Sequence, residues 1–147
     1  MQETWIQARL KQFENVCRQK GVPVTMQRRA ILEAVLQRDD HPTAEHIYET
    51  VRQRIPQLSR TTVYRVLDAL AELGLVRRLH HTGTARFDGN MIRHHHLVCT
   101  QCGTILDMED EALDQLSLPD QGLQGFAIDD FSIYFTGTCP DCRKQKE

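Results

Sequence analysis

The stretch RHHHLVCTQCGTILDMED, residues 93–110, brings three histidines, two cysteines and several carboxylates together within a short segment. Two five-residue runs within it, HHLVC and TILDM, are typical of strands. His94 and His96 alternate along the chain, so both side chains project from one face while His95 projects from the other. The stretch predicts metal binding. It leaves open how many ions are bound, and whether histidines and cysteines share one.

Four of the five cysteines form two C-x2-C pairs. Two such pairs can present four sulfurs tetrahedrally, which is the geometry of structural zinc sites with no open position. In a reducing compartment paired cysteines bind metal more often than they form disulfides. We therefore expect a structural Zn²⁺ whose loss unfolds the C-terminal module that carries these cysteines. The expected ligands are Cys99, Cys102, Cys139 and Cys142.

The histidines are left for a second site, together with nearby aspartates. Imidazole and carboxylate donors suit Fe²⁺, Mn²⁺ or Zn²⁺, and five of them leave one position of the ion open. From the residues alone, a surface histidine run is an equally good interpretation, and His41 joins the others only if the fold brings it there. The candidate set is His41, Asp88, His94, His96 and Asp107.

The N-terminal part of the chain has the pattern of a winged helix-turn-helix. Helical periodicity covers residues 5–20 and recurs after Thr25, after Thr43 and after Ser59, three residues that can cap helices. Gly74 follows the fourth helix, where a left-handed residue is favoured. Short extended runs at 76–79 and 84–87 then predict a hairpin that turns at Gly83.

The fourth helix, which begins in the segment SRTTVYRVLDAL, is the candidate reader of DNA. Its apolar residues face inward, which leaves polar side chains for phosphates and base edges in the major groove. An ordinary amphipathic helix with solvated arginines is the alternative. The expected contacts are Arg60, Thr61, Tyr64 and Arg65, with a basic wing of Arg77, Arg78, His80, His81 and Arg86 along the backbone.

Charge divides the chain unevenly. Residues 1–90 hold 14 Lys and Arg against 10 Asp and Glu, whereas residues 91–147 hold 4 against 10. The first part can therefore meet phosphates and the second cannot. We expect an α+β protein with a DNA-binding domain at 1–87, a hinge at 88–93 and a small α/β domain at 94–147. Within the last domain a helix is expected near 112–116 and an alternating strand over 126–139. No signal peptide or membrane span is evident, so a cytoplasmic location is expected.

Several motifs at matching spacing resemble the ferric uptake regulator family of bacterial metal-dependent transcription factors. They are the T-x-Q-R element at 25–28, HPTAEHIY, TTVYRVLDALAELGLV, RFD, HHHLVC-x2-CG and CPDC. The resemblance covers nearly the whole chain. It implies a homodimer formed by the C-terminal domain, repression at double-stranded promoter DNA, structural Zn²⁺ on the four cysteines and a regulatory ion on the five-residue set.

The acidic ligands indicate a branch of that family. Iron-uptake regulators typically have glutamates there, whereas peroxide-sensing members have aspartates, as Asp88 and Asp107 are here. That branch implies that Fe²⁺ reduces hydrogen peroxide and that a ligand histidine, His41 or His94, is oxidised, so that the metal and then the DNA are released. Mn²⁺ would repress without sensing. The alternative is an iron-responsive uptake repressor of the same architecture.

Two departures narrow the resemblance further. Many iron-uptake members have a third metal site, but here its expected positions hold Arg93, His95, Asp114 and Phe131, and phenylalanine cannot bind a metal. We therefore predict no third site. Residues 88–93 contain no cysteine, which is unlike the zinc-uptake branch. A facial non-haem iron enzyme is disfavoured because no general base or substrate pocket is evident, so a regulator rather than an enzyme is predicted.

Overall fold

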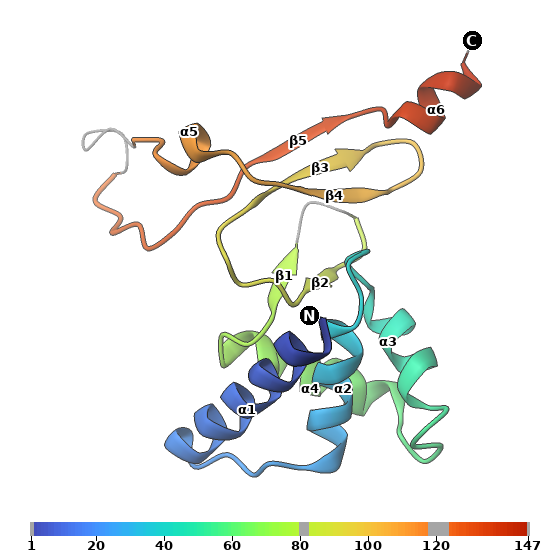
Figure 1. The fold of residues 1–147 in the computed structure, drawn as a ribbon, viewed down its shortest axis with the longest axis vertical. Coiled ribbons are helices and arrows are strands. Elements are labelled where there is room, and N and C mark those ends of the chain that lie inside the picture. The colour runs from blue at the N-terminus through green and yellow to red at the C-terminus, as the bar shows by residue number, and fades with distance from the viewer. Residues whose placement is uncertain (1, 80–82, 118–123, 147) are drawn as a thin grey trace. The chain divides into compact units, whose positions relative to one another are not determined.

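The computed structural model describes residues 2–79, 83–117 and 124–146. The chain divides into two compact units, Met1–Met91 and Ile92–Glu147, and their junction falls inside the segment expected to be a hinge. The α+β class is confirmed, with helices dominating the first unit and a sheet the second (Figure 1). No helix among the described residues has the length and apolar character needed to cross a membrane.

Four helices form the first unit: α1 (Gln2–Lys20), α2 (Met26–Leu36), α3 (Ala44–Val51) and α4 (Arg60–Glu72). Their apolar stripes meet in one core, because residues at helical spacing share a face. Cys17 is fully buried in this core, and burial raises the pKa of its thiol. It is therefore a packing residue.

The predicted caps are present. Thr25, Thr43 and Ser59 each accept a hydrogen bond from a backbone N–H three residues on, at 3.1 to 3.2 Å. At Thr43 the cap is reciprocal, since His46 Nδ1 accepts from the Thr43 N–H at 3.2 Å. Gly74 has φ +74°, as expected of a residue that ends a helix. The third helix ends at Val51, and residues 52–54 continue as turns.

The wing consists of β1 (Arg77–Leu79) and β2 (Arg86–Asp88), which pair antiparallel. A third segment joins them. Thr43 bridges Arg86 antiparallel, and the Phe87 N–H donates to the Pro42 carbonyl at 2.9 Å. The segment around Thr43 runs antiparallel to β2, so this register brings His41 opposite Asp88.

The second unit is a three-stranded sheet in the order β4-β3-β5. Its strands are β3 (His95–Cys99), β4 (Ile105–Met108) and β5 (Tyr134–Gly137), with short helices α5 (Glu111–Asp114) and α6 (Pro140–Gln145) (Figure 1). Strand β3 lies antiparallel to β4 and parallel to β5.

The strand predicted over 126–139 is wrong in extent, because only residues 134–137 pair with β3. The first backbone bond between these segments is donated by the His96 N–H to the Ile133 carbonyl. Strand β3 begins at His95, so earlier residues of the segment have no β3 residues to pair with. The predicted helix begins one residue earlier and ends two residues earlier than expected, with Asp110 as its cap.

Candidate metal centres and DNA-binding surface

The four paired cysteines meet at one end of the sheet. Cys99 ends β3, and the turn after it carries Cys102 and returns through Gly103, whose φ is +78°. Because β5 runs parallel to β3, its end reaches the same place, and Cys139 follows two residues later. Pro140 starts α6, which places Cys142 in the first turn of that helix. All four Sγ atoms lie within 4.8 Å of one another.

This arrangement fits zinc. Zn–S bonds of about 2.3 Å in a tetrahedron set the sulfurs about 3.8 Å apart, and the Sγ atoms of Cys102 and Cys139 are 3.8 Å apart. The Cys139 N–H donates to Cys99 Sγ at 3.4 Å. Such N–H···S bonds orient the ligands.

The surroundings of Cys99, Cys102 and Cys142 shift the pKa values of their thiols in different directions. Backbone N–H groups of Cys102 and Cys139 stabilise the Cys99 thiolate and lower its pKa to about 6. Hydrogen bonding to Thr104 lowers the pKa of Cys102. Hydrogen bonding to Cys139, together with burial, raises the pKa of Cys142 to about 12. Four thiolates at this spacing need a cation among them, and zinc supplies one.

The other end of β3 carries imidazoles. His96 lies opposite Asp107 in the β3–β4 register, and the Nε2 atoms of His94 and His96 lie 3.4 and 3.5 Å from Asp107 Oδ1. His94 Nδ1 is 2.6 Å from the Ile92 carbonyl oxygen, which can only accept. Nδ1 therefore carries the proton, and Nε2 is the nitrogen able to bind a metal.

In the first unit, two of the predicted regulatory ligands lie together, His41 and Asp88. His41 Nε2 lies 3.5 Å from Asp88 Oδ2, and both side chains are buried. His41 has φ +55° although it is not glycine. Such a left-handed backbone conformation costs about 1–3 kcal/mol and is most often found at functional sites. The backbone pairing described above supports this geometry. The expected set is thus met as two groups, His41 with Asp88 and His94 with His96 and Asp107, and their union in one site stays a prediction.

Sequence reasoning missed Arg9. Its guanidinium donates to the Gly89 carbonyl and, at 2.6 Å, to the Leu75 carbonyl, next to the Asp88 ligand position. No motif marks it. The one available signal is a charged residue beside the apolar Ile6 and Leu10 of a predicted helix.

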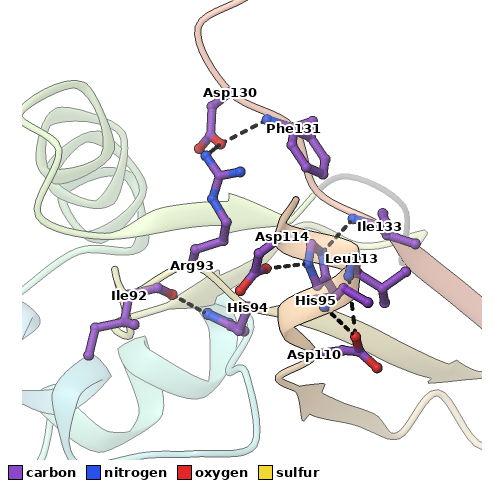
Figure 2. Close-up of polar contacts among 11 residues, drawn as sticks. Ile92, Arg93, His94, His95, Asp110, Leu113, Asp114, Asp130, Phe131 and Ile133 are labelled. Atoms are coloured by element: carbon purple, nitrogen blue, oxygen red, sulfur yellow. Dashed lines mark hydrogen bonds and ion pairs between the residues drawn. The ribbon is translucent and has the colours of Figure 1, made fainter. Parts of the chain in front are cut away.

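At the positions where many iron-uptake members have a third metal site, the side chains of this protein bond one another. Figure 2 shows Arg93 paired with Asp130, at 2.7 Å. The guanidinium carbon lies 4.8 Å from the ring centre of Phe131. His95 Nδ1 accepts from the Ile133 N–H at 3.1 Å, so its Nε2–H donates to Asp114 at 2.8 Å. These residues do not fit a metal, because a cation already lies there and both nitrogens of His95 are engaged.

The candidate recognition helix is α4, and all four residues expected to contact DNA are exposed on it. Three of them, Thr61, Tyr64 and Arg65, have no side-chain hydrogen bond to another described residue that would compete with DNA. Arg60 is also exposed but is engaged. Its guanidinium bonds Glu45 at 3.1 to 3.2 Å and lies 4.5 Å from the ring centre of Tyr48. Any phosphate that Arg60 binds must compete with Glu45.

The wing is less available than expected. Arg78 pairs with Asp68, and Arg86 donates to the His41 carbonyl at 3.3 Å. Arg78 thus holds the wing to α4, and Arg86 holds it to the segment before α3. His80 and His81 lie outside the described residues.

Comparisons with known proteins agree with this architecture. A model of the ferric uptake regulator family matches residues 19–136. The peroxide-responsive repressor PerR of Staphylococcus aureus is 33% identical over 127 residues, 86% of each chain.

Solved structures show the same fold. The ferric uptake regulator of Helicobacter pylori, described with three functional metal-binding sites, matches with a TM-score of 0.76 at 19% identity, over 94% of this chain and 93% of that one. A zinc uptake regulator in complex with zinc and DNA matches with a TM-score of 0.67 at 25% identity, over 96% and 97%. The chain belongs to the ferric uptake regulator family of metal-dependent transcriptional regulators.

Proposed function

We propose that this protein is a dimeric, metal-dependent repressor that releases promoter DNA when hydrogen peroxide oxidises a regulatory histidine. The observation that carries the proposal is that both acids of the regulatory set are aspartates, Asp88 and Asp107, each within 3.5 Å of an imidazole. The similarity to PerR, a protein named as a peroxide-responsive repressor, supports it. The four-cysteine cluster holds a structural Zn²⁺.

The regulatory ion, Fe²⁺ or Mn²⁺, is bound by His41, Asp88, His94, His96 and Asp107 together. This assignment is supported by the small number of donors that each unit offers by itself. The first unit offers two nitrogen and oxygen donors and the second offers three, whereas these metals prefer larger donor sets. If one ion satisfies both groups, its binding couples the DNA-binding unit to the second unit, and occupancy controls DNA affinity.

Promoter DNA is bound by α4. Its exposed face carries Thr61, Tyr64 and Arg65, with Arg60 at the N-terminal end, and residues near the start of a recognition helix reach base edges. The structure of a zinc uptake regulator with DNA shows that a protein of this fold binds DNA. Two copies of α4 in a dimer would read two half-sites.

Peroxide sensing depends on His41 and His94, two of the three histidines that lie against these aspartates. A ferrous ion held by these residues would mediate transfer of one peroxide oxygen to a ligand imidazole while the other oxygen leaves as water, so that the ring is oxidised by two electrons as the peroxide is reduced. His41 and His94 each direct Nε2 toward an aspartate oxygen, so both rings lie where an ion would be held. An oxidised imidazole is a poor ligand. Losing it leaves too few donors to retain the ion, and the DNA-binding state is lost.

The proposal is tested by treating the iron-loaded protein with peroxide and mapping oxidised peptides. We expect the mass of one added oxygen on peptides containing His41 or His94, together with loss of a promoter gel shift. The Mn²⁺-loaded protein is the control and should keep both its mass and its shift. No metal-dependent shift at any salt concentration would overturn the DNA-binding role, since such binding weakens steeply with salt.

The second candidate is an iron-responsive uptake repressor. It is favoured by the match to a Vibrio cholerae ferric uptake regulator, at 30% identity with a TM-score of 0.64 over 85% of this chain and 98% of that one. Unmodified histidine peptides, with the gel shift retained after peroxide, would select this function over peroxide sensing.

A further inference from the structure

Arg9 lies in α1, outside the region that the family model matches. Its guanidinium is held between two backbone carbonyls, those of Leu75 and Gly89. The indole of Trp5 lies 5.5 Å from the guanidinium carbon. Leu75 precedes the wing and Gly89 follows it, so one side chain joins the first helix to both ends of the wing.

The Gly89 end of this contact is tightly constrained. The Asn90 N–H donates to Asp88 Oδ1 at 2.9 Å. A Cβ at Gly89 would lie 2.9 Å from Leu36 Cδ2, so this loop packs closely against the end of α2. Arg9 holds the carbonyl of this same glycine. The residues after β2 are therefore held through a backbone carbonyl, a packed Cα and a bond to the Asp88 carboxylate.

Burial of a guanidinium needs compensation. Burial lowers the pKa of Arg9, and attraction to Asp88 partly offsets that effect. An arginine whose only task was solubility would lie in solvent, whereas this one is half-buried beside a candidate ligand. Buried cations keep such positions when their bonds position other groups or oppose a charge.

We propose that Arg9 is a positioning residue for the regulatory metal site: by holding the Gly89 carbonyl, it keeps the Asp88 carboxylate directed at His41 Nε2. The inference rests on the proposed function, since it assigns Asp88 to a metal. It adds the first helix to the machinery of the site, and so extends control of metal affinity to a part of the chain that supplies no ligand.

Two effects of Arg9 on metal affinity have opposite signs. Its positive charge repels a divalent cation, so removing the charge would tighten binding. Its bonds preorganise the ligand loop, so removing them would weaken binding. Both bonds go to carbonyl oxygens, whose partial negative charge offsets much of the repulsion. Hydrogen-bond partners of a metal ligand change metal affinity by about 10–100-fold, and Arg9 acts one step further out, through the backbone beside Asp88. The positioning effect therefore dominates.

The test compares Arg9→Met, which keeps the apolar stem, with Arg9→Lys, which keeps the charge and a single donor group. Arg29→Met is the matched control, because Arg29 also links α1 to the rest of the unit, through Glu14 at 2.6 Å. Zinc content and thermal melting check that each full-length variant folds. Amide exchange of Asn90 is then measured by NMR without a regulatory metal, followed by Mn²⁺ titration.

We expect faster Asn90 exchange and about tenfold weaker Mn²⁺ binding in Arg9→Met, an intermediate result in Arg9→Lys and wild-type behaviour in Arg29→Met. Unchanged Asn90 exchange, or Mn²⁺ binding as tight as or tighter than wild type, would overturn the inference. An Asp88→Ala variant distinguishes failure of the proposed regulatory site from failure of the role assigned to Arg9. If it binds Mn²⁺ like wild type, the proposed regulatory site is wrong, and the exchange data still report whether Arg9 holds the loop.

Discussion

Strand β3 connects two donor sets built in different ways. At its end, Cys99 joins three other sulfurs, all from the second unit and all within 4.8 Å. Near its start, His94 and His96 meet Asp107 within the same unit, and in the first unit His41 meets Asp88. The donors of the sulfur set all belong to a single unit, whereas the donors proposed for the regulatory ion come from both.

The difference teaches how one chain can hold two metals with different tasks. Four identical soft ligands on short turns form a closed site, which suits a permanent structural ion. Mixed nitrogen and oxygen donors divided between units bind harder ions and leave room for exchange. If the proposed regulatory ion binds donors of both units, its affinity includes the free energy of bringing them together, which makes that affinity adjustable.

Removing a sulfur tests the first half of this comparison with the largest expected effect. Cys142→Ser should lose zinc and the cooperative melting of residues 92–147, because ion binding and folding are coupled in small zinc modules. Zinc per chain and circular dichroism melts measure this. Cys17→Ala, in the core of the other unit, should keep its zinc. A zinc-free variant whose melting is unchanged would show that the cluster is not structural.

Removing one aspartate from each unit tests the division of the second set. Asp107→Ala and Asp88→Ala should each weaken Mn²⁺ binding about 100-fold or more, while zinc per chain stays constant, because each removes a direct ligand. Calorimetric titration measures the affinity. If only Asp107→Ala has an effect, the ion belongs to the second unit alone and the comparison between closed and divided sites fails.

His95 lies between His94 and His96 in the sequence and sharpens the comparison, since its ring nitrogens bond protein groups. Asp114→Asn should lower stability by about 1 kcal/mol, the value of a typical hydrogen bond, and leave both metal contents unchanged. Thermal melts with metal analysis provide the measurement. The matched variant Asp110→Asn, at the cap of the same helix, reports the cost of disturbing α5 itself. A fall in metal content in Asp114→Asn alone would reveal a third ion.

The smallest effect is expected at the DNA-binding surface. Glu45→Gln should raise promoter affinity severalfold and change neither metal, because it releases Arg60. The hydrogen bond from Arg60 lowers the pKa of Glu45, so the competing pair is intact at neutral pH and is lost only as the pH falls through that lowered pKa. Fluorescence anisotropy at fixed salt measures the change, with Glu49→Gln as the control. Weaker binding in Glu45→Gln would mean that Glu45 orients Arg60 for DNA.

Much of the fold was predictable because its signals are local. Caps at Thr25, Thr43 and Ser59, the apolar stripes between them and the glycine at 74 all act within a few residues. The strand over 126–139 was overpredicted because alternation alone does not show whether a partner is present, and β3 offers one only to residues 134–137.

By itself the sequence determined the donor chemistry: paired thiols for one ion, imidazoles and short acids for another, and a helix with arginines at its start. These follow from residue type and short spacing. Only the tertiary structure decided which groups meet. The pairing of residues 41–43 with β2 places His41 on Asp88, and the fold of α1 places Arg9 on Gly89. Such contacts join residues 47 to 80 positions apart, and backbone register and packing select them, which no local pattern encodes.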